Sequence, residues 1–158
     1  MFSTAVFNIA PRHDSYASTT MSCNEGISPV IANNSSTSNS GFDSFAFNYS
    51  KSGGLRSTHD AICYSSNDGL VVKINNKSVT TKQLSNSAAN DLQQTIMKNI
   101  HVFNTYRPTP GSADYFNYTI TILLNGSKYR GSWTDASSGV PTGLLEVRKE
   151  IERAASNP

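Results

Sequence analysis

Residues 116–133 read FNYTITILLNGSKYRGSW, and this stretch decides the fold. Apolar and polar residues alternate on both sides of Asn125-Gly126, as in strands that place alternate side chains on opposite faces of a sheet. An Asn-Gly pair favours the two-residue type I′ turn of a β-hairpin, which fixes the register of the two strands. The pairs expected are Leu124 with Ser127, Ile122 with Tyr129, Ile120 with Gly131 and Tyr118 with Trp133, and the face that holds Tyr129 and Trp133 is the inner one.

Three more strands are expected upstream of this hairpin. Phe45, Phe47 and Tyr49 alternate with other residues and predict a strand with an aromatic inner face, which Gly53-Gly54 ends. A second strand is expected over about residues 58–65 and a third over 70–75, joined by a turn at Asn67-Asp68-Gly69. The inner face of this second hairpin is expected to carry Ile62, Tyr64, Leu70, Val72 and Ile74.

Two amphipathic helices complete the order β-β-β-α-β-β-α. Each has an apolar stripe at helical spacing, and a capping serine (Ser85 or Ser87) or Pro141 precedes it. We therefore expect an α+β fold: a mainly antiparallel sheet of four to five strands with both helices packed on one face. The stripes are Ala88, Leu92, Ile96 and Ile100 in the first helix, and Leu144, Val147, Ile151 and Ala155 in the second.

The chain of 158 residues has the length of one domain with a tail. Residues 33–40 are a polar Asn/Ser/Thr tract, so we expect a disordered tail over 1–42 and the domain over 43–156. Of the two cysteines, Cys23 and Cys63, two reduced thiols are favoured over a bridge. The lack of a signal peptide favours a cytoplasmic protein. We expect a monomer when free.

The sequence gives no support for catalysis or for several classes of ligand. A net charge of +2 offers no electrostatic case for nucleic acid, and no apolar run is long enough to span a membrane. His13, His59 and His101 lack a second ligand at metal-binding spacing, and nucleotide-binding and hydrolase motifs are absent from the sequence. The charges of the last helix, which include Arg148 and Glu152, read as a solvated face. We expect no enzyme activity, no metal and no cofactor.

Two segments, YSKSGGL at 49–55 and PGSADYFNY at 110–118, carry a resemblance to a known family. Together with the element order, they resemble emfourin-type proteins, small bacterial inhibitors of thermolysin-like zinc metallopeptidases. The resemblance implies a non-enzymatic inhibitor that occludes the active-site cleft of such a peptidase with a rigid surface. The partner-binding residues expected are Gly53, Gly54, Leu55, Arg56, Arg107, Pro108, Pro110 and Asp114.

Two other interpretations remain open. The chain could be a protein-interaction module of the same fold whose partner is not a protease. The same residues also have a purely structural explanation, in which Gly53-Gly54 turns the chain, Asp114 caps a loop or pairs with an arginine, and Tyr118 packs against Trp133.

Overall fold

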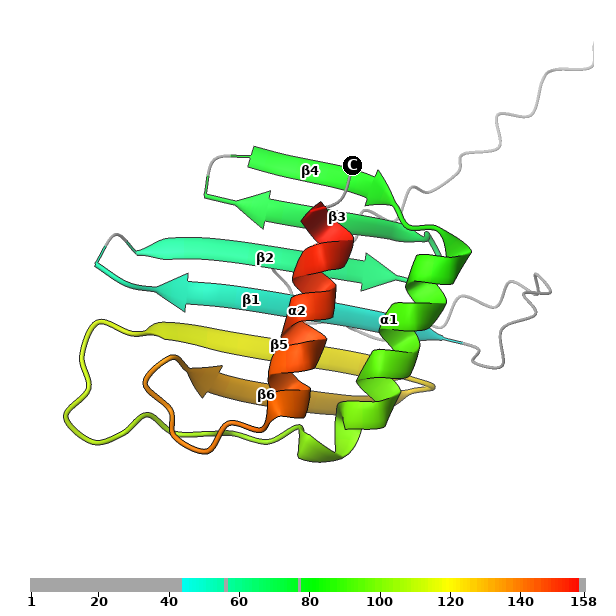
Figure 1. The fold of residues 1–158 in the computed structure, drawn as a ribbon. Helices are drawn as coiled ribbons and strands as arrows, with labels where there is room; N and C mark the ends of the chain where they lie inside the picture. Colours follow the sequence, from blue (N-terminus) through cyan, green and yellow to red (C-terminus); the bar gives the residue numbers. More distant parts are fainter. Residues whose placement is uncertain (1–43, 56, 77, 157–158) are drawn as a thin grey trace, which may run out of the picture.

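The computed structural model describes residues 44–55, 57–76 and 78–156 as an α+β domain. Six strands form one antiparallel sheet in the order β4-β3-β2-β1-β5-β6, and two α-helices cover it (Figure 1). The expected tail over 1–42 lies outside the described residues. In chain order the elements are β1 (Phe45–Gly53), β2 (Thr58–Ser65), β3 (Leu70–Asn75), β4 (Ser78–Gln83), α1 (Asn86–Asn99), the 3₁₀ turn η1 (Ile100–Val102), β5 (Phe116–Leu124), β6 (Ser127–Thr134) and α2 (Thr142–Ser156).

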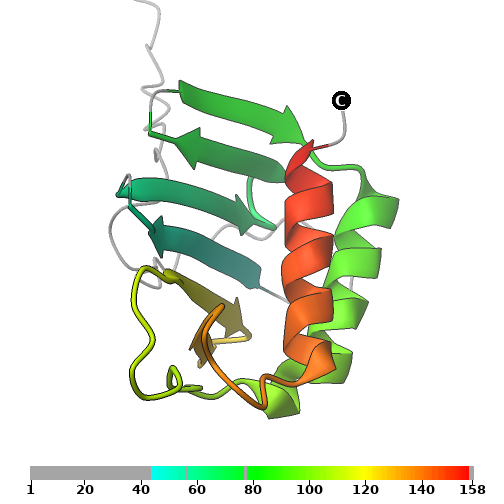
Figure 2. The same cartoon turned by 60° about the vertical axis from the view of Figure 1, so that its left-hand side comes forward.

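Both helices lie side by side on one face of the sheet, as expected (Figure 2). Ser85 caps α1, and its side chain accepts a hydrogen bond from the Ala88 amide over 3.2 Å. Pro141 directly precedes α2. The apolar stripes face the sheet, and their fully buried members are Leu92, Ile96, Leu144, Val147 and Ile151.

The register predicted for the last hairpin is confirmed at all four pairs. Tyr118 and Trp133 stack with ring centroids 5.3 Å apart and an angle of 16° between the ring planes. The inner face of β1 is confirmed as well, because Phe45, Phe47 and Tyr49 are all buried beneath the helices. Aromatic side chains therefore contribute much of the apolar area that holds the two layers together.

The sheet has one strand more than expected, because β4 follows β3 through a tight connection in which Asn75 pairs with Ser78. The order of elements is therefore β-β-β-β-α-β-β-α. The sequence SVTTKQ of β4 shows no apolar alternation, since this edge strand is mostly exposed. Its turn also lacks the glycine that marks many hairpins.

The inner face predicted for the second hairpin is wrong in one strand. Tyr64 pairs with Val71 and Ile62 with Lys73, so Val71 and not Val72 faces the helices. Residues 66–69 connect β2 to β3, and their number is even, whereas the expected faces require an odd number of connecting residues. Because a shift of one residue exchanges the two faces of a strand, Leu70, Val72 and Ile74 point to the opposite face.

Cys63 is disulfide-bonded, so the expectation of two reduced thiols is wrong. No cysteine among the described residues is free, and Cys23 lies outside them. Within the described residues, no helix is long and apolar enough to cross a bilayer.

Candidate functional site

Most of the predicted binding residues lie together at one end of the sheet. β1 ends where β5 begins, because the two strands are antiparallel neighbours and Gly53 pairs with Phe116. The Gly54 amide also donates a hydrogen bond of 3.4 Å to the carbonyl oxygen of Tyr115. We call the β1–β2 turn (residues 53–55) and the loop of residues 107–114 the rim.

The turn in the rim depends on glycine. Gly54 has a φ of +73°, and a Cβ built on it would lie 2.8 Å from the Phe116 ring, closer than side chains tolerate. A side chain at position 54 would therefore be strained by the positive φ and would have to displace the Phe116 ring. The next residue, Leu55, is 88% exposed, so an apolar side chain stands in water at the tip of the turn.

The loop that leads into β5 is anchored along its first half. The Tyr106 amide donates to the Ser132 carbonyl over 2.8 Å, and the Thr109 amide donates to the Ala136 carbonyl over 2.9 Å. The Ser137 hydroxyl donates to the Tyr106 carbonyl over 2.8 Å. These bonds fasten the loop to the edge of β6 and to the β6–α2 connection, and Pro108 adds stiffness.

The remaining predicted residues differ in how they are presented. Arg107, Pro110 and Asp114 are exposed, whereas Pro108 is partly buried beside Ser137. Asp114 has a φ of +57° and makes no hydrogen bond or ion pair within the described part of the chain. The structural alternative for Asp114, a loop cap or an arginine partner, is therefore not found. Arg56 lies outside the described residues.

Sequence reasoning missed a second group of residues, beside the rim on the helix side of the sheet. The Lys51 ammonium lies 4.3 Å from the centroid of the Phe116 ring, and the Arg148 guanidinium carbon lies 4.3 Å from that of Tyr118. Both contacts have the distance of a cation–π interaction. They extend the aromatic surface from the rim toward α2.

Arg148 also belongs to a polar contact between α2 and the sheet. The Tyr49 hydroxyl donates to Glu152 Oε1 over 2.7 Å, and Arg148 Nε donates to the same oxygen over 2.9 Å. We call Tyr49, Tyr118, Arg148 and Glu152 the α2 cluster. Arg148 and Glu152 were expected on a solvated helix face, but they are only partly exposed and contact Tyr118 and Tyr49 of the sheet. Their positions, each next to a residue of the buried stripe, were the signal available in the sequence.

Burial and hydrogen bonding shape the ionisation of this cluster. Burial, and then the hydrogen bond to Glu152, raise the pKa of Tyr49 well above its usual value. Burial also raises the pKa of Tyr118 against the opposing effect of Arg148. For Arg148, burial lowers the pKa, but the bond to Glu152 and the nearby phenols outweigh it, so its pKa is raised overall. The cluster therefore holds neutral phenols beside one ion pair.

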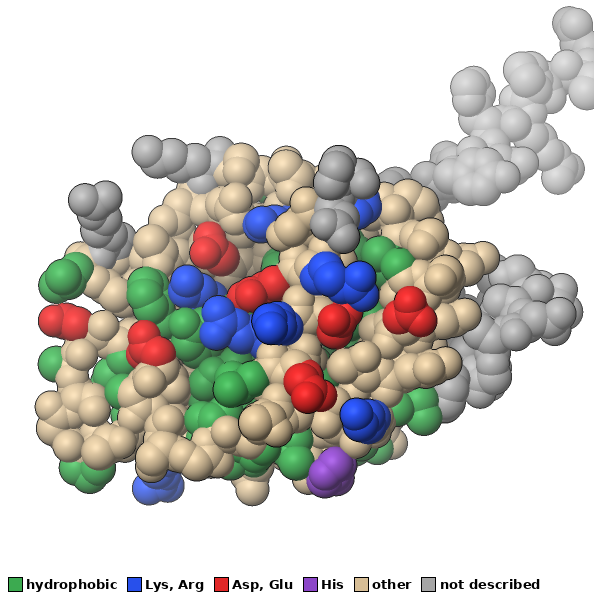
Figure 3. All heavy atoms as spheres, in the orientation of Figure 1, with side chains coloured by type: hydrophobic (Ala, Val, Ile, Leu, Met, Phe, Trp, Pro, Cys, Tyr) green, Lys and Arg blue, Asp and Glu red, His purple; other side chains and the backbone are tan. Residues whose placement is uncertain are grey.

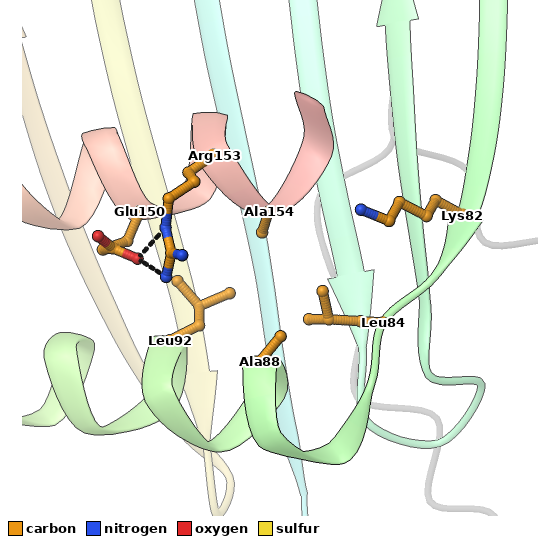
Figure 4. Close-up of a pocket in the computed structure, with 7 residues that line it drawn as sticks. All are labelled: Lys82, Leu84, Ala88, Leu92, Glu150, Arg153 and Ala154. Carbon is orange, nitrogen blue, oxygen red and sulfur yellow. Dashed lines mark hydrogen bonds and ion pairs between the residues drawn. The ribbon is translucent and has the colours of Figure 1, made fainter. Parts of the chain in front are cut away.

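A separate hollow opens between the two helices and the β4–α1 connection (Figure 4). Its polar lining includes Glu150 and Arg153, which are joined by two hydrogen bonds of 2.6 and 2.9 Å. No group of three His, Cys, Asp or Glu residues in the described ranges is placed to hold a metal ion. The residues that line the hollow are Lys82, Leu84, Ala88, Leu92, Glu150, Arg153 and Ala154.

On the helix side of the molecule, basic and acidic side chains intermix over α2, and apolar side chains show between them and the rim end of the sheet (Figure 3). In comparisons with known proteins, no family model matches this chain and no curated protein matches it. The rim and the adjoining aromatic surface are therefore the candidate functional site.

Proposed function

We propose that this chain is a non-enzymatic protein inhibitor that binds a thermolysin-like zinc metallopeptidase and covers its active-site cleft. The observation that carries the proposal is Leu55, an apolar side chain that is exposed where β1 turns toward β2. Isolated apolar side chains on a surface are common, but Leu55 directly follows Gly54, which lies against the Phe116 ring.

The anchoring of the rim supports an inhibitory role over a substrate-like one. A preorganised loop loses less conformational entropy on binding than a flexible one. The loop of residues 107–114 is held at Thr109 and carries Pro108 and Pro110, which also make poor cleavage sites. An occluding surface of this kind needs no catalytic group of its own.

The contact surface would extend from Leu55 across the Phe116 ring to Lys51. An exposed leucine suits the apolar pockets that the resemblance implies for peptidases of this class. Aromatic rings and cations beside such an anchor are typical of the residues that dominate binding energy at interfaces.

The direct test is titration of thermolysin with the full-length protein, followed by hydrolysis of a peptide substrate. We expect activity to disappear near an equimolar ratio. Leu55→Ala should weaken inhibition by about tenfold or more, equivalent to about 1.4 kcal/mol. Leu70→Ala is the matched control, because Leu70 is also exposed but lies at the opposite end of the sheet.

Full activity at micromolar excess of the protein over several thermolysin-like peptidases would reject the proposal. Equal loss of inhibition in the Leu55 and Leu70 variants would reject the rim as the site while leaving inhibition itself in place.

A second candidate function, a protein-interaction module with a non-protease partner, is favoured by the edge position of β4 in the sheet. Segment 104–106 covers the outer edge of β6, whereas β4 pairs within the described residues only with β3. An open edge strand can accept a strand from a partner, and Val79 is 65% exposed there. Val79→Lys should abolish such binding, and Leu55→Ala should leave it intact.

A further inference from the structure

The centre of the sheet is closed to solvent on the face that the helices do not cover. Ala61 and Cys63 in β2 are each 2% exposed, and Ala46 in β1 is 8% exposed. In each strand they alternate with residues that face the helices, so they point the opposite way. Both described helices lie on the other side (Figure 2), and small side chains on a bare sheet would be open to water.

The surroundings of these buried residues are apolar as well. Val72 and Ile74 of β3 lie beside Cys63 and Ala61, and Leu123 of β5 lies beside Ala46. All three are only partly exposed. We call Ala46, Ala61, Cys63, Val72, Ile74 and Leu123 the outer patch. A patch of this kind favours a covering segment with apolar side chains.

The disulfide points to one candidate for the segment that would cover the outer patch. Cys63 lies at the centre of the patch and is disulfide-bonded, and the only other cysteine of the chain is Cys23. The sequence CNEGISPVIA at 23–32 supplies Ile27, Val30 and Ile31 directly after that cysteine.

The length of the chain allows this connection. Cys63 pairs with Asn48, which is close in sequence to the start of the described domain at Ser44. The residues between Cys23 and Ser44 can span roughly 60 Å or more when extended, at about 3.3 Å per residue. The segment can therefore reach the patch with length to spare.

We propose that the outer patch is the docking surface for the chain's own N-terminal segment, residues 1–43, and that a Cys23–Cys63 disulfide fastens it there. Formation of the bond takes two protons and two electrons from the two thiols. A disulfide such as oxidised glutathione accepts them and leaves as two thiols. Since disulfides persist in oxidising surroundings, the docked form belongs outside the reducing cytosol.

The test compares the full-length protein with Cys23→Ser, a variant that removes the tether and leaves the sheet untouched. Both are exposed to oxidised glutathione, and thiols are counted in denaturant without reductant. Non-reducing peptide maps are then taken of the monomer fraction. We expect no free thiol and one linked pair, Cys23 with Cys63, in the monomeric wild type.

Hydrogen exchange gives the second readout, over the amides of residues 24–43. In the oxidised wild type we expect exchange slowed by about tenfold or more in part of this range, relative to an unstructured chain. Cys23→Ser, or reduction of the wild type, should remove that protection. Ile74→Ser should weaken it, and Leu145→Ser, an exposed leucine of α2 on the other side of the sheet, is the control that should not.

Three outcomes would overturn the proposal. Two free thiols after oxidation would exclude the tether. A covalent dimer joined through Cys63 of two copies would make a second copy the occupant. Exchange at the unstructured rate throughout 24–43, with the disulfide intact, would show a tether without docking.

Discussion

At the residue scale, the Tyr49 hydroxyl connects the sheet to α2. It lies beneath α2 and donates to Glu152, which is bound to Arg148 at the same oxygen. Burying a phenol without a hydrogen-bond partner costs free energy because the hydroxyl loses its water. The bond to Glu152 offsets this cost and connects the sheet to α2.

Tyr49→Phe should therefore lower the free energy of unfolding by about 1–2 kcal/mol, the range for a hydrogen bond to a charged group. Chemical denaturation measures this directly. Tyr64→Phe is the matched control: Tyr64 is also buried, but its hydroxyl makes no hydrogen bond within the described residues, so little change is expected. Equal losses in the two variants would contradict this role for Glu152.

The same phenol predicts how stability depends on pH. Burial and Glu152 raise the pKa of Tyr49 in the folded protein, whereas the pKa of a tyrosine in the unfolded chain is about 10. Its contribution is thus fully present below pH about 10 and is lost as the pH rises further. Denaturation curves recorded from pH 8 to 11 should show stability falling above about pH 10, with a shallower fall in Tyr49→Phe. If the pH dependence of stability is the same in Tyr49→Phe as in the wild type, groups other than Tyr49 cause the loss of stability.

The candidate site could be predicted from sequence only in part. Gly53-Gly54 and the prolines of the loop predicted two turns, and the structure has a turn after β1 and a loop before β5 at these residues. Their meeting at Gly53 and Phe116 depends on β1 lying next to β5, a long-range pairing that no local pattern encodes. The α2 cluster was missed for a similar reason, since only the tertiary structure brings Tyr49 under Glu152.

At the scale of elements, the strands with the clearest alternation of apolar and polar residues were predicted correctly. The β5–β6 hairpin has long alternation and an Asn-Gly turn, and each expected pair is found. β4 lacks apolar alternation because it buries little, and its existence rests on backbone pairing with β3. The face of β3 was misassigned because Leu70, Val71 and Val72 are all apolar, so that only the length of the turn sets the register.

The corrected register of β3 can be tested with two adjacent valines. Val71→Ala should lower the free energy of unfolding by about 2 kcal/mol, the order expected when buried methyl groups are removed from a core. Val72→Ala should cost clearly less, because its side chain lies on the partly exposed outer face. Chemical denaturation of the two variants side by side makes the comparison. A larger loss at Val72 would restore the register expected from the sequence.

At the scale of the whole molecule, a single core joins both α-helices and five of the six strands of the described domain. Residues from β1, β2, β3, β5, β6, α1 and α2 contribute to one buried cluster. Domains of this size with one core usually unfold in a single cooperative step.

We therefore expect far-ultraviolet circular dichroism and tryptophan fluorescence to give coincident unfolding curves. The two signals report independent features, the first the helices and strands and the second the packing around Trp133. Separate midpoints would show that the helical layer leaves the sheet before the sheet itself unfolds.

Trp133 is the chain's only tryptophan, and it is 4% exposed. It stacks on Tyr118, whose other neighbour is the guanidinium of Arg148, next to the surface proposed for binding. A binding partner that contacts Arg148 would change the electric field at the Trp133 indole, two contacts away. The intrinsic fluorescence of Trp133 should therefore report binding in real time, without an attached dye.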